Sequence, residues 1–102
     1  MNFEQLREYK PQLKRLARKY GIKKLYVFGS IARGESRIQS DVDFLVEMKP
    51  ESSLFGVGGF GYEAQQLLGI QVDVVPMSVL PQTKDRDFVK NIERDAVPLF
   101  RC

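Results

Sequence analysis

Three aspartates interrupt the apolar segments of this 102-residue sequence, at spacings that suit a divalent cation. Asp41 and Asp43 begin the segment DVDFLVEM (41–48), and strand residues two apart point to the same face, so we expect their side chains to project together. Neighbouring carboxylates repel each other unless a cation lies between them. Asp73 stands in a second apolar segment, IQVDVVP (70–76), and reaches the pair if the two segments form adjacent strands. Three such hard oxygen donors can hold two Mg²⁺ ions.

Each aspartate also has a purely structural interpretation. Asp41 follows Ser40 and could simply begin a strand, while Asp43 could occupy an edge position that faces water. For an isolated D-x-D pair, this interpretation outweighs a metal site. The third acid and an upstream Gly-Ser turn favour the metal site.

The Gly-Ser turn consists of Gly29 and Ser30, which follow the apolar run KLYVF (24–28) where a strand should pass into a helical turn. Glycine allows a ligand to approach the backbone closely, and exposed N–H groups at such a turn suit a phosphate. Ser30 could donate its hydroxyl to a phosphate oxygen or only cap the turn. Arg33, one turn further on, could reach the same anion or stay solvated, and Arg37 is a weaker candidate. Phosphate donors beside metal-binding acids predict a site for a nucleoside triphosphate.

The composition excludes several classes of chemistry. Histidine is absent, which removes Ser-His-Asp and Cys-His catalysis and every His-bound metal centre. The single cysteine, Cys102, excludes a disulfide framework and a cysteine-based zinc site. No apolar stretch approaches the roughly 18 residues that span a bilayer, and the N-terminus lacks the apolar core of a signal peptide. We therefore expect a cytoplasmic protein with no membrane partner.

The elements that must position these groups alternate between helix and strand. Helical spacing predicts a short N-terminal helix, a break near Lys10 and a second helix over 11–20 that Gly21 caps. The predicted strands are 24–28, 41–48 and 70–76. A short turn of helix from Ser30 should stop at Gly34.

Two further helices are predicted in the remaining segments. Tyr62 to Leu68 should be helical, whereas four glycines between 56 and 61 weaken the segment before it. Residues 83–100 should form a last helix with Phe88, Ile92 and Ala96 on one face. This order predicts a single α/β domain over 1–102, a small mixed β-sheet flanked by helices.

The segment FGSIARGESRIQSDVDFLV resembles the G-S-x10-D-x-D signature of the DNA polymerase beta-like nucleotidyltransferase superfamily. Its G-S-x-A-R-G start is similar to that of the minimal nucleotidyltransferase branch. The later QVDVV resembles the strand that bears the third acid of the family, and AVPLF resembles the C-terminal ending. The resemblance covers nearly the whole chain and implies the polymerase beta-like fold.

The resemblance also implies a role for each site residue. Asp41 and Asp43 would bind two Mg²⁺ ions, and Asp73 would ligate the catalytic ion and help to activate an attacking hydroxyl. Gly29 and Ser30 would hold the triphosphate of ATP. The hydroxyl would attack the α-phosphorus in line, and pyrophosphate would leave.

Minimal members of the family often act as antitoxins of a HEPN-domain ribonuclease, so the resemblance implies a hetero-oligomer in which AMP passes from ATP to a tyrosine of that toxin. Two alternatives stay open. The protein could neutralise the toxin by direct binding, with little or no catalysis. It could also bind nucleic acid through residues 1–24, which hold eight Lys and Arg against two acids; we rank this alternative last, because no aromatic-stacking pattern accompanies the charge.

One segment departs from the pattern. Gly56, Gly58 and Gly61 spell G-x-G-x-x-G, a dinucleotide-binding fingerprint. A complete dinucleotide fold does not fit around these glycines, and Asp73 comes only twelve residues after Gly61 rather than about twenty. We interpret the segment as a flexible loop or as a surface for close helix packing against a partner.

Overall fold

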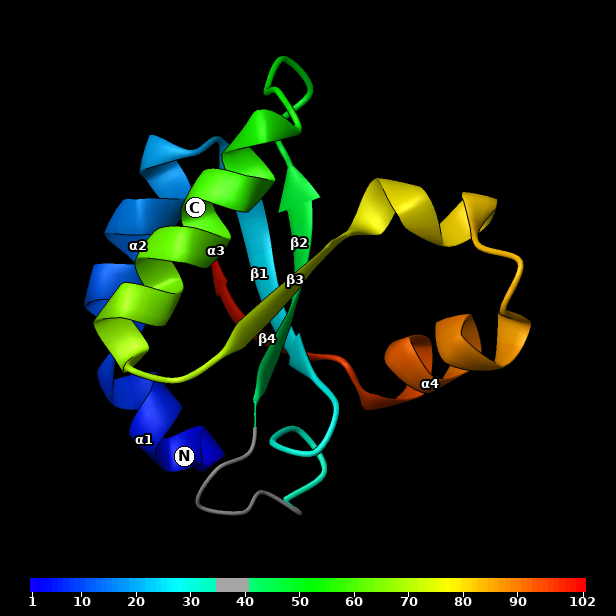
Figure 1. The fold of residues 1–102 in the computed structure, drawn as a ribbon, viewed down its shortest axis with the longest axis horizontal. Helices are drawn as coiled ribbons and strands as arrows, with labels where there is room; N and C mark the ends of the chain where they lie inside the picture. Colours follow the sequence, from blue (N-terminus) through cyan, green and yellow to red (C-terminus); the bar gives the residue numbers. More distant parts are fainter. Residues whose placement is uncertain (35–40) are drawn as a thin grey trace.

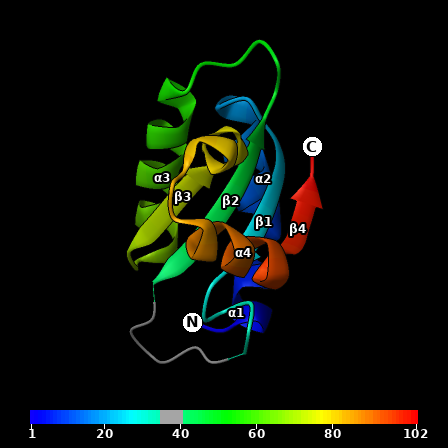
Figure 2. The same cartoon turned by 90° about the vertical axis from the view of Figure 1, so that its right-hand side faces the viewer.

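A four-stranded sheet separates two groups of helices in the computed structural model, which describes residues 1–34 and 41–102 (Figure 1). The strands are β1 (Ile22–Phe28), β2 (Val42–Met48), β3 (Val72–Pro76) and β4 (Val97–Arg101). One face of the sheet carries α1 (Phe3–Glu8), α2 (Lys10–Lys19) and α3 (Phe55–Leu68). The other face carries the 3₁₀-helix η1 (Met77–Gln82) and α4 (Arg86–Asp95), which Figure 2 shows in front of the strands. None of the described helices is long and apolar enough to cross a membrane.

The strand order β3-β2-β1-β4 makes a mixed sheet, which confirms the predicted fold class. β1 pairs antiparallel with both β2 and β4, whereas β2 and β3 are parallel. Parallel neighbours need a crossover connection, and α3 supplies it. Because β2 lies between β1 and β3, the register of β2 is fixed from two sides.

The two N-terminal helices follow the prediction. An Asn2–Gln5 capping box begins α1, and the break comes at Tyr9, with Pro11 in the first turn of α2, where proline is tolerated. Gly21 follows the C-cap residue Tyr20 with φ +76°, the left-handed conformation of a glycine that ends a helix.

The prediction for the C-terminal segment was incomplete. Residues 83–100 do not form one helix: α4 ends at Asp95, and β4 then pairs with β1. β4 has five residues and contains Pro98, which fits an edge strand but weakens its sequence signal. The buried face of α4 is made by Val89 and Ile92, while Phe88 is 38% exposed and meets the ring of Phe28 edge-on.

The prediction of a weakened segment before Tyr62 was wrong, because α3 is helical throughout Phe55–Leu68. A Cβ atom at Gly56 would collide with the carbonyl of Tyr20, and one at Gly59 with its ring. The Tyr20 hydroxyl donates to Glu63, whose carboxylate also lies 2.9 Å from Lys19 Nζ. These glycines therefore let α3 pack closely against the end of α2 within the chain, so the segment is not a flexible loop.

Apolar side chains fill both faces of the sheet. The larger core lies beneath α1, α2 and α3 and includes Phe44 and Phe60, whose rings meet edge-on with centroids 5.9 Å apart. The smaller core lies beneath η1 and α4 and consists of Phe28, Leu45, Leu80, Val89 and Ile92. Among the described residues, the second face is thus covered by fewer buried apolar side chains than the first.

Two neighbouring glycines of α3 should respond oppositely to alanine. Gly58→Ala should stabilise the fold by up to about 1 kcal/mol, because its added methyl meets no atom within 4 Å and alanine favours helix. Gly59→Ala should destabilise it by about 1–3 kcal/mol, because the methyl displaces the Tyr20 ring. Urea unfolding of both variants measures the difference. A Gly59→Ala variant as stable as the unmodified chain would contradict this packing.

Candidate active site

The predicted site residues meet at one end of the sheet, where β1 ends and β2 and β3 begin. Phe28, the last residue of β1, is paired in register with Asp43, and Asp43 is paired in register with Asp73. Gly29 follows Phe28 directly and therefore also lies at this end. The strand order thus brings together residues that are 44 positions apart in the sequence (29 to 73).

Strand alternation places Asp43 and Asp73 on the same face. Val42 and Phe44 are fully buried in the larger core, so Asp43 between them points to the face of η1 and α4. Val74 likewise packs against the larger core, and Asp73 beside it points the opposite way. The structure therefore brings these two carboxylates together as the sequence predicted.

Asp41 lies one residue before β2 and is exposed, so the strand is one residue shorter than predicted at this end. Its charge still acts on Asp43. Among the described residues, however, no three acidic side chains gather closely enough to form a ready-made metal cage. The three aspartates therefore influence one another electrostatically, but they do not form a closed set of metal ligands.

Asp43 is the electrostatically strained member of the set. Its burial, and then the charges of Asp73 and Asp41, raise the pKa of this carboxyl from 3.8 to about 6, against a smaller lowering by Arg33. A half-buried carboxylate among like charges is costly to ionise, and a cation removes that cost. Such a perturbed group beside further acids is typical of functional sites.

The chemistry of the donors fits Mg²⁺. All three are carboxylates, the hard oxygen ligands that this ion prefers. Proteins usually hold Mg²⁺ with one or two carboxylates, while phosphate oxygens of the substrate and water complete the octahedron. A pair such as Asp43 and Asp73, with Asp41 nearby, suits an ion that is bound together with a phosphate-bearing ligand.

Glycine is required at position 29 for two independent reasons. Its φ is +78°, a conformation that other residues rarely adopt. A Cβ atom there would also collide with Asp43 Oδ2. The backbone therefore passes directly beside the strained carboxylate, which only a residue without a side chain permits.

The predicted turn of helix after Gly29 is a single turn. The Arg33 N–H donates to the Gly29 carbonyl at 3.2 Å, and the Gly34 N–H donates to the Ile31 carbonyl at 3.2 Å. Ile31 is buried in the larger core and anchors the turn. Ser30 is half-buried and precedes no helix among the described residues, so its hydroxyl does not serve as a helix cap there.

Arg33 connects the turn to α4. Its Nη1 donates to Asp95 Oδ2 at 2.9 Å, and Arg94 Nε donates to Asp95 Oδ1 at 3.0 Å. The hydrogen bonds from Arg94, and then from Arg33, lower the pKa of Asp95. Sequence reasoning missed Asp95, because its contact with Arg33 depends on how α4 docks. Arg37 lies outside the described residues.

Comparison with known sequences identifies the family. The family model described as "Nucleotidyltransferase domain" matches residues 7–99. A protein of Methanocaldococcus jannaschii, provisionally named a protein adenylyltransferase, is 38% identical over 82 residues, which are 79% of this chain and 88% of the relative. The protein adenylyltransferase MntA of Thermococcus cleftensis is 39% identical over 67 residues, or 66% of this chain and 68% of the relative.

Solved structures agree in fold. A structure described provisionally as a minimal nucleotidyltransferase has a TM-score of 0.75, 32% identity and 96% coverage of both chains. A toxin–antitoxin structure with AMP-PNP has a TM-score of 0.69 at 18% identity, covering 91% of this chain and 73% of that one. The complex of a tri-AMPylated Shewanella oneidensis HEPN toxin with its MNT antitoxin has a TM-score of 0.64 at 16% identity, covering 98% and 74%. At such identities the last two likenesses show the fold alone.

The carboxylate pair beside a positive-φ glycine, the mixed sheet that positions it and the match over residues 7–99 agree: this chain belongs to the nucleotidyltransferase domain family, in its minimal branch, and is a nucleotidyltransferase.

Proposed function

We propose that this protein is a Mg²⁺-dependent adenylyltransferase that transfers AMP from ATP to a tyrosine of a HEPN-domain toxin and thereby acts as its antitoxin. The observation that carries the proposal is the half-buried Asp43, held in register with Asp73 and beside the backbone of Gly29. Two relatives bear the name protein adenylyltransferase, the Methanocaldococcus one provisionally. A chain of similar fold has been solved in complex with an AMPylated HEPN toxin.

The phosphate end of the site is the turn that follows β1. Gly29 leaves the backbone bare, and the Ser30 hydroxyl would donate to a phosphate oxygen. Arg33 adds positive charge at this end, held by Asp95 so that it stays beside the turn. These three residues would bind the triphosphate and leave the α-phosphorus directed toward the acids.

The metal end of the site consists of Asp41, Asp43 and Asp73. Asp41 and Asp43 would hold both ions, and Asp73 would join them at the catalytic one. When bound, Mg²⁺ would neutralise the triphosphate and lower the pKa of the attacking hydroxyl. Asp73 is exposed on the edge strand β3, whereas Asp43 is half-buried on the inner strand β2, so Asp73 is the better placed of these two acids to accept the proton of an incoming hydroxyl. The oxygen then bonds to the α-phosphorus, and pyrophosphate leaves.

Asp43→Asn should reduce AMP transfer by at least about a hundredfold, because even residues that only support a metal ligand change metal affinity or activity by 10–100-fold. Mass spectrometry of a HEPN-domain protein incubated with this chain, Mg²⁺ and ATP measures the transfer. Asp87→Asn, on the exposed first turn of α4, is the control for loss of one negative charge.

Equal transfer by Asp43→Asn and the unmodified chain would contradict the assignment. If the Asp41→Asn, Asp43→Asn double variant lost transfer and yet neutralised the toxin fully in cells, direct binding rather than catalysis would be the antitoxin mechanism.

Mg²⁺ affinity should depend on pH through Asp43. The ion binds the carboxylate form, and the pKa of Asp43 is about 6, so protonation competes with the metal below that pH. We expect a constant affinity above about pH 7 and a fall toward about tenfold per pH unit below pH 6. Calorimetric titration between pH 5 and 8 measures it, with Asp43→Asn expected to flatten the dependence. A flat profile for the unmodified chain would contradict this role.

A further inference from the structure

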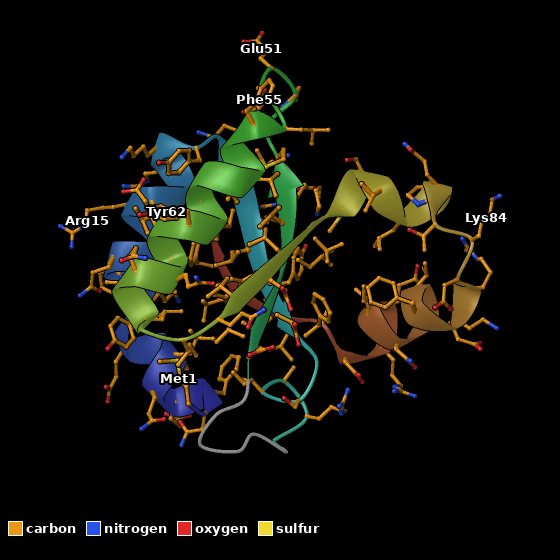
Figure 3. The ribbon with its side chains drawn as sticks, viewed as in Figure 1. Met1, Arg15, Glu51, Phe55, Tyr62 and Lys84 are labelled. Atoms are coloured by element: carbon orange, nitrogen blue, oxygen red, sulfur yellow. The ribbon has the colours of Figure 1, made fainter. Side chains whose placement is uncertain are left out.

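A groove runs along the outer edge of β3, which pairs with no further strand among the described residues, and reaches Asp73 of the candidate site. It lies between α3 and β3, has a volume of about 290 Å³, and is lined by residues that include Gly58, Gly61, Tyr62, Gln65 and Asp73. Figure 2 shows β3 at the margin of the sheet, between β2 and α3. Figure 3 labels Tyr62 on α3, and this residue is 66% exposed. Asp73 is exposed on the edge strand and belongs both to the groove lining and to the acids of the candidate site.

The outer edge of β3 offers backbone groups for hydrogen bonding. The Val42 N–H donates to the Gln71 carbonyl at 3.1 Å, so residues 71, 73 and 75 direct their backbone groups toward β2. Val72 and Val74 direct theirs outward, and no described strand pairs with that side. The Val72 N–H has a substitute partner, because it donates to Gln65 Oε1 at 3.2 Å. A side-chain amide thus occupies the place that a neighbouring strand's carbonyl would take.

The four glycines of α3 form two pairs that differ in what a Cβ atom added at each position would contact. Gly56 and Gly59 are needed for packing on Tyr20, as described above. A methyl group added at Gly58 would meet nothing within 4 Å, and one added at Gly61 would meet only the Val74 side chain, at 3.3 Å. Glycine costs about 1 kcal/mol within a helix, and internal packing does not require it at position 58. Glycine at position 58 leaves the surface of α3 without a side chain where it faces the groove beside β3.

We propose that an extended segment of the acceptor protein adds to the sheet along the outer edge of β3 and lays side chains over Gly58 and Gly61. This inference rests on the proposed function, because it concerns how the hydroxyl of a protein substrate is delivered. Strand addition draws affinity from main-chain hydrogen bonds and specificity from alternate side chains.

Strand geometry explains why this edge would deliver a hydroxyl correctly. An added strand lies about 4.8 Å from β3, and the residue opposite Asp73 points to the same face as Asp73 and Asp43. The residues on either side of it point to the opposite face, into the groove over α3. One acceptor residue is thus presented to the acids while its neighbours are held by the groove.

A second copy of this chain is a poorer occupant of the edge. Pairing two β3 strands would bring a second Asp73 to an edge that already carries Asp73, with Asp43 on the neighbouring inner strand. Like charges near one another across paired strands are destabilising. A segment of the acceptor protein need not carry an acidic residue opposite Asp73, so it avoids this repulsion.

The test compares two side chains at one position. Gly58→Phe fills the groove, Gly58→Ala leaves it open, and Gln66→Phe adds the same ring to an exposed position of α3 that does not line the groove. Transfer to a HEPN-domain protein should lose at least about tenfold in kcat/KM with Gly58→Phe, chiefly through KM, should change much less with the smaller methyl of Gly58→Ala, and should stay near the unmodified value with the Gln66→Phe control. Binding of Mg²⁺ with AMP-PNP should be equal in all four proteins, which also verifies that Gly58→Phe is folded.

Amide exchange gives a second measurement. When the acceptor carries phenylalanine in place of its modified tyrosine, binding should protect the Val74 amide, which points outward in the free chain. Equal kinetics of Gly58→Phe and Gly58→Ala together with an unprotected Val74 amide would overturn strand addition while leaving the proposed function intact. Absence of any transfer by the unmodified chain would overturn the proposed function, and strand addition with it. A dimer of this chain that Gly58→Phe dissociates would identify a second copy as the occupant and overturn the proposal.

Discussion

The cost of ionising the half-buried Asp43 carboxyl is the physical constraint on which the rest of the account depends. β2 is an inner strand, so pairing with β1 and β3 fixes the Asp43 backbone from both sides, and the residue is half-buried there. Burial and two nearby carboxylates then make its ionised form costly, which raises its pKa to about 6. In the proposed function, a cation bound beside Asp43 would remove this repulsion.

Missing side chains are as important to this architecture as the charged ones. Gly29 leaves space for the Asp43 carboxylate at the end of β1, and Gly56 and Gly59 leave space for Tyr20 between α2 and α3. Gly58 leaves space that no part of the described chain fills. The first three uses are internal and follow from close packing. The space at Gly58 faces outward, which is why we propose that a substrate occupies it.

The placement of the candidate site residues was more predictable from the sequence than the boundaries of the elements around them. Alternation along a strand is a local rule, so the shared face of Asp43 and Asp73 followed once the two segments were taken as neighbours. The positive φ of Gly29 likewise agrees with a turn that the Gly-Ser pair predicts. The start of α3 could not be predicted, because the penalty of four glycines is local whereas the Tyr20 contact that favours the helix is not. β4 and the Arg33–Asp95 contact were missed for the same reason: both depend on where the C-terminal segment docks.

Relief of the strained Asp43 carboxylate by a nucleotide-bound cation underlies both the proposed reaction and its pH dependence. Carbon-13 NMR of the Asp43 carboxyl, followed against pH, measures this relief without any acceptor protein. We expect an apparent pKa near 6 in the free chain, and a value displaced well below it when Mg²⁺ and AMP-PNP are both present. A carboxyl that titrates at an ordinary aspartate pKa in the free chain, or at the same pKa with and without Mg²⁺ and AMP-PNP, would contradict this role of Asp43.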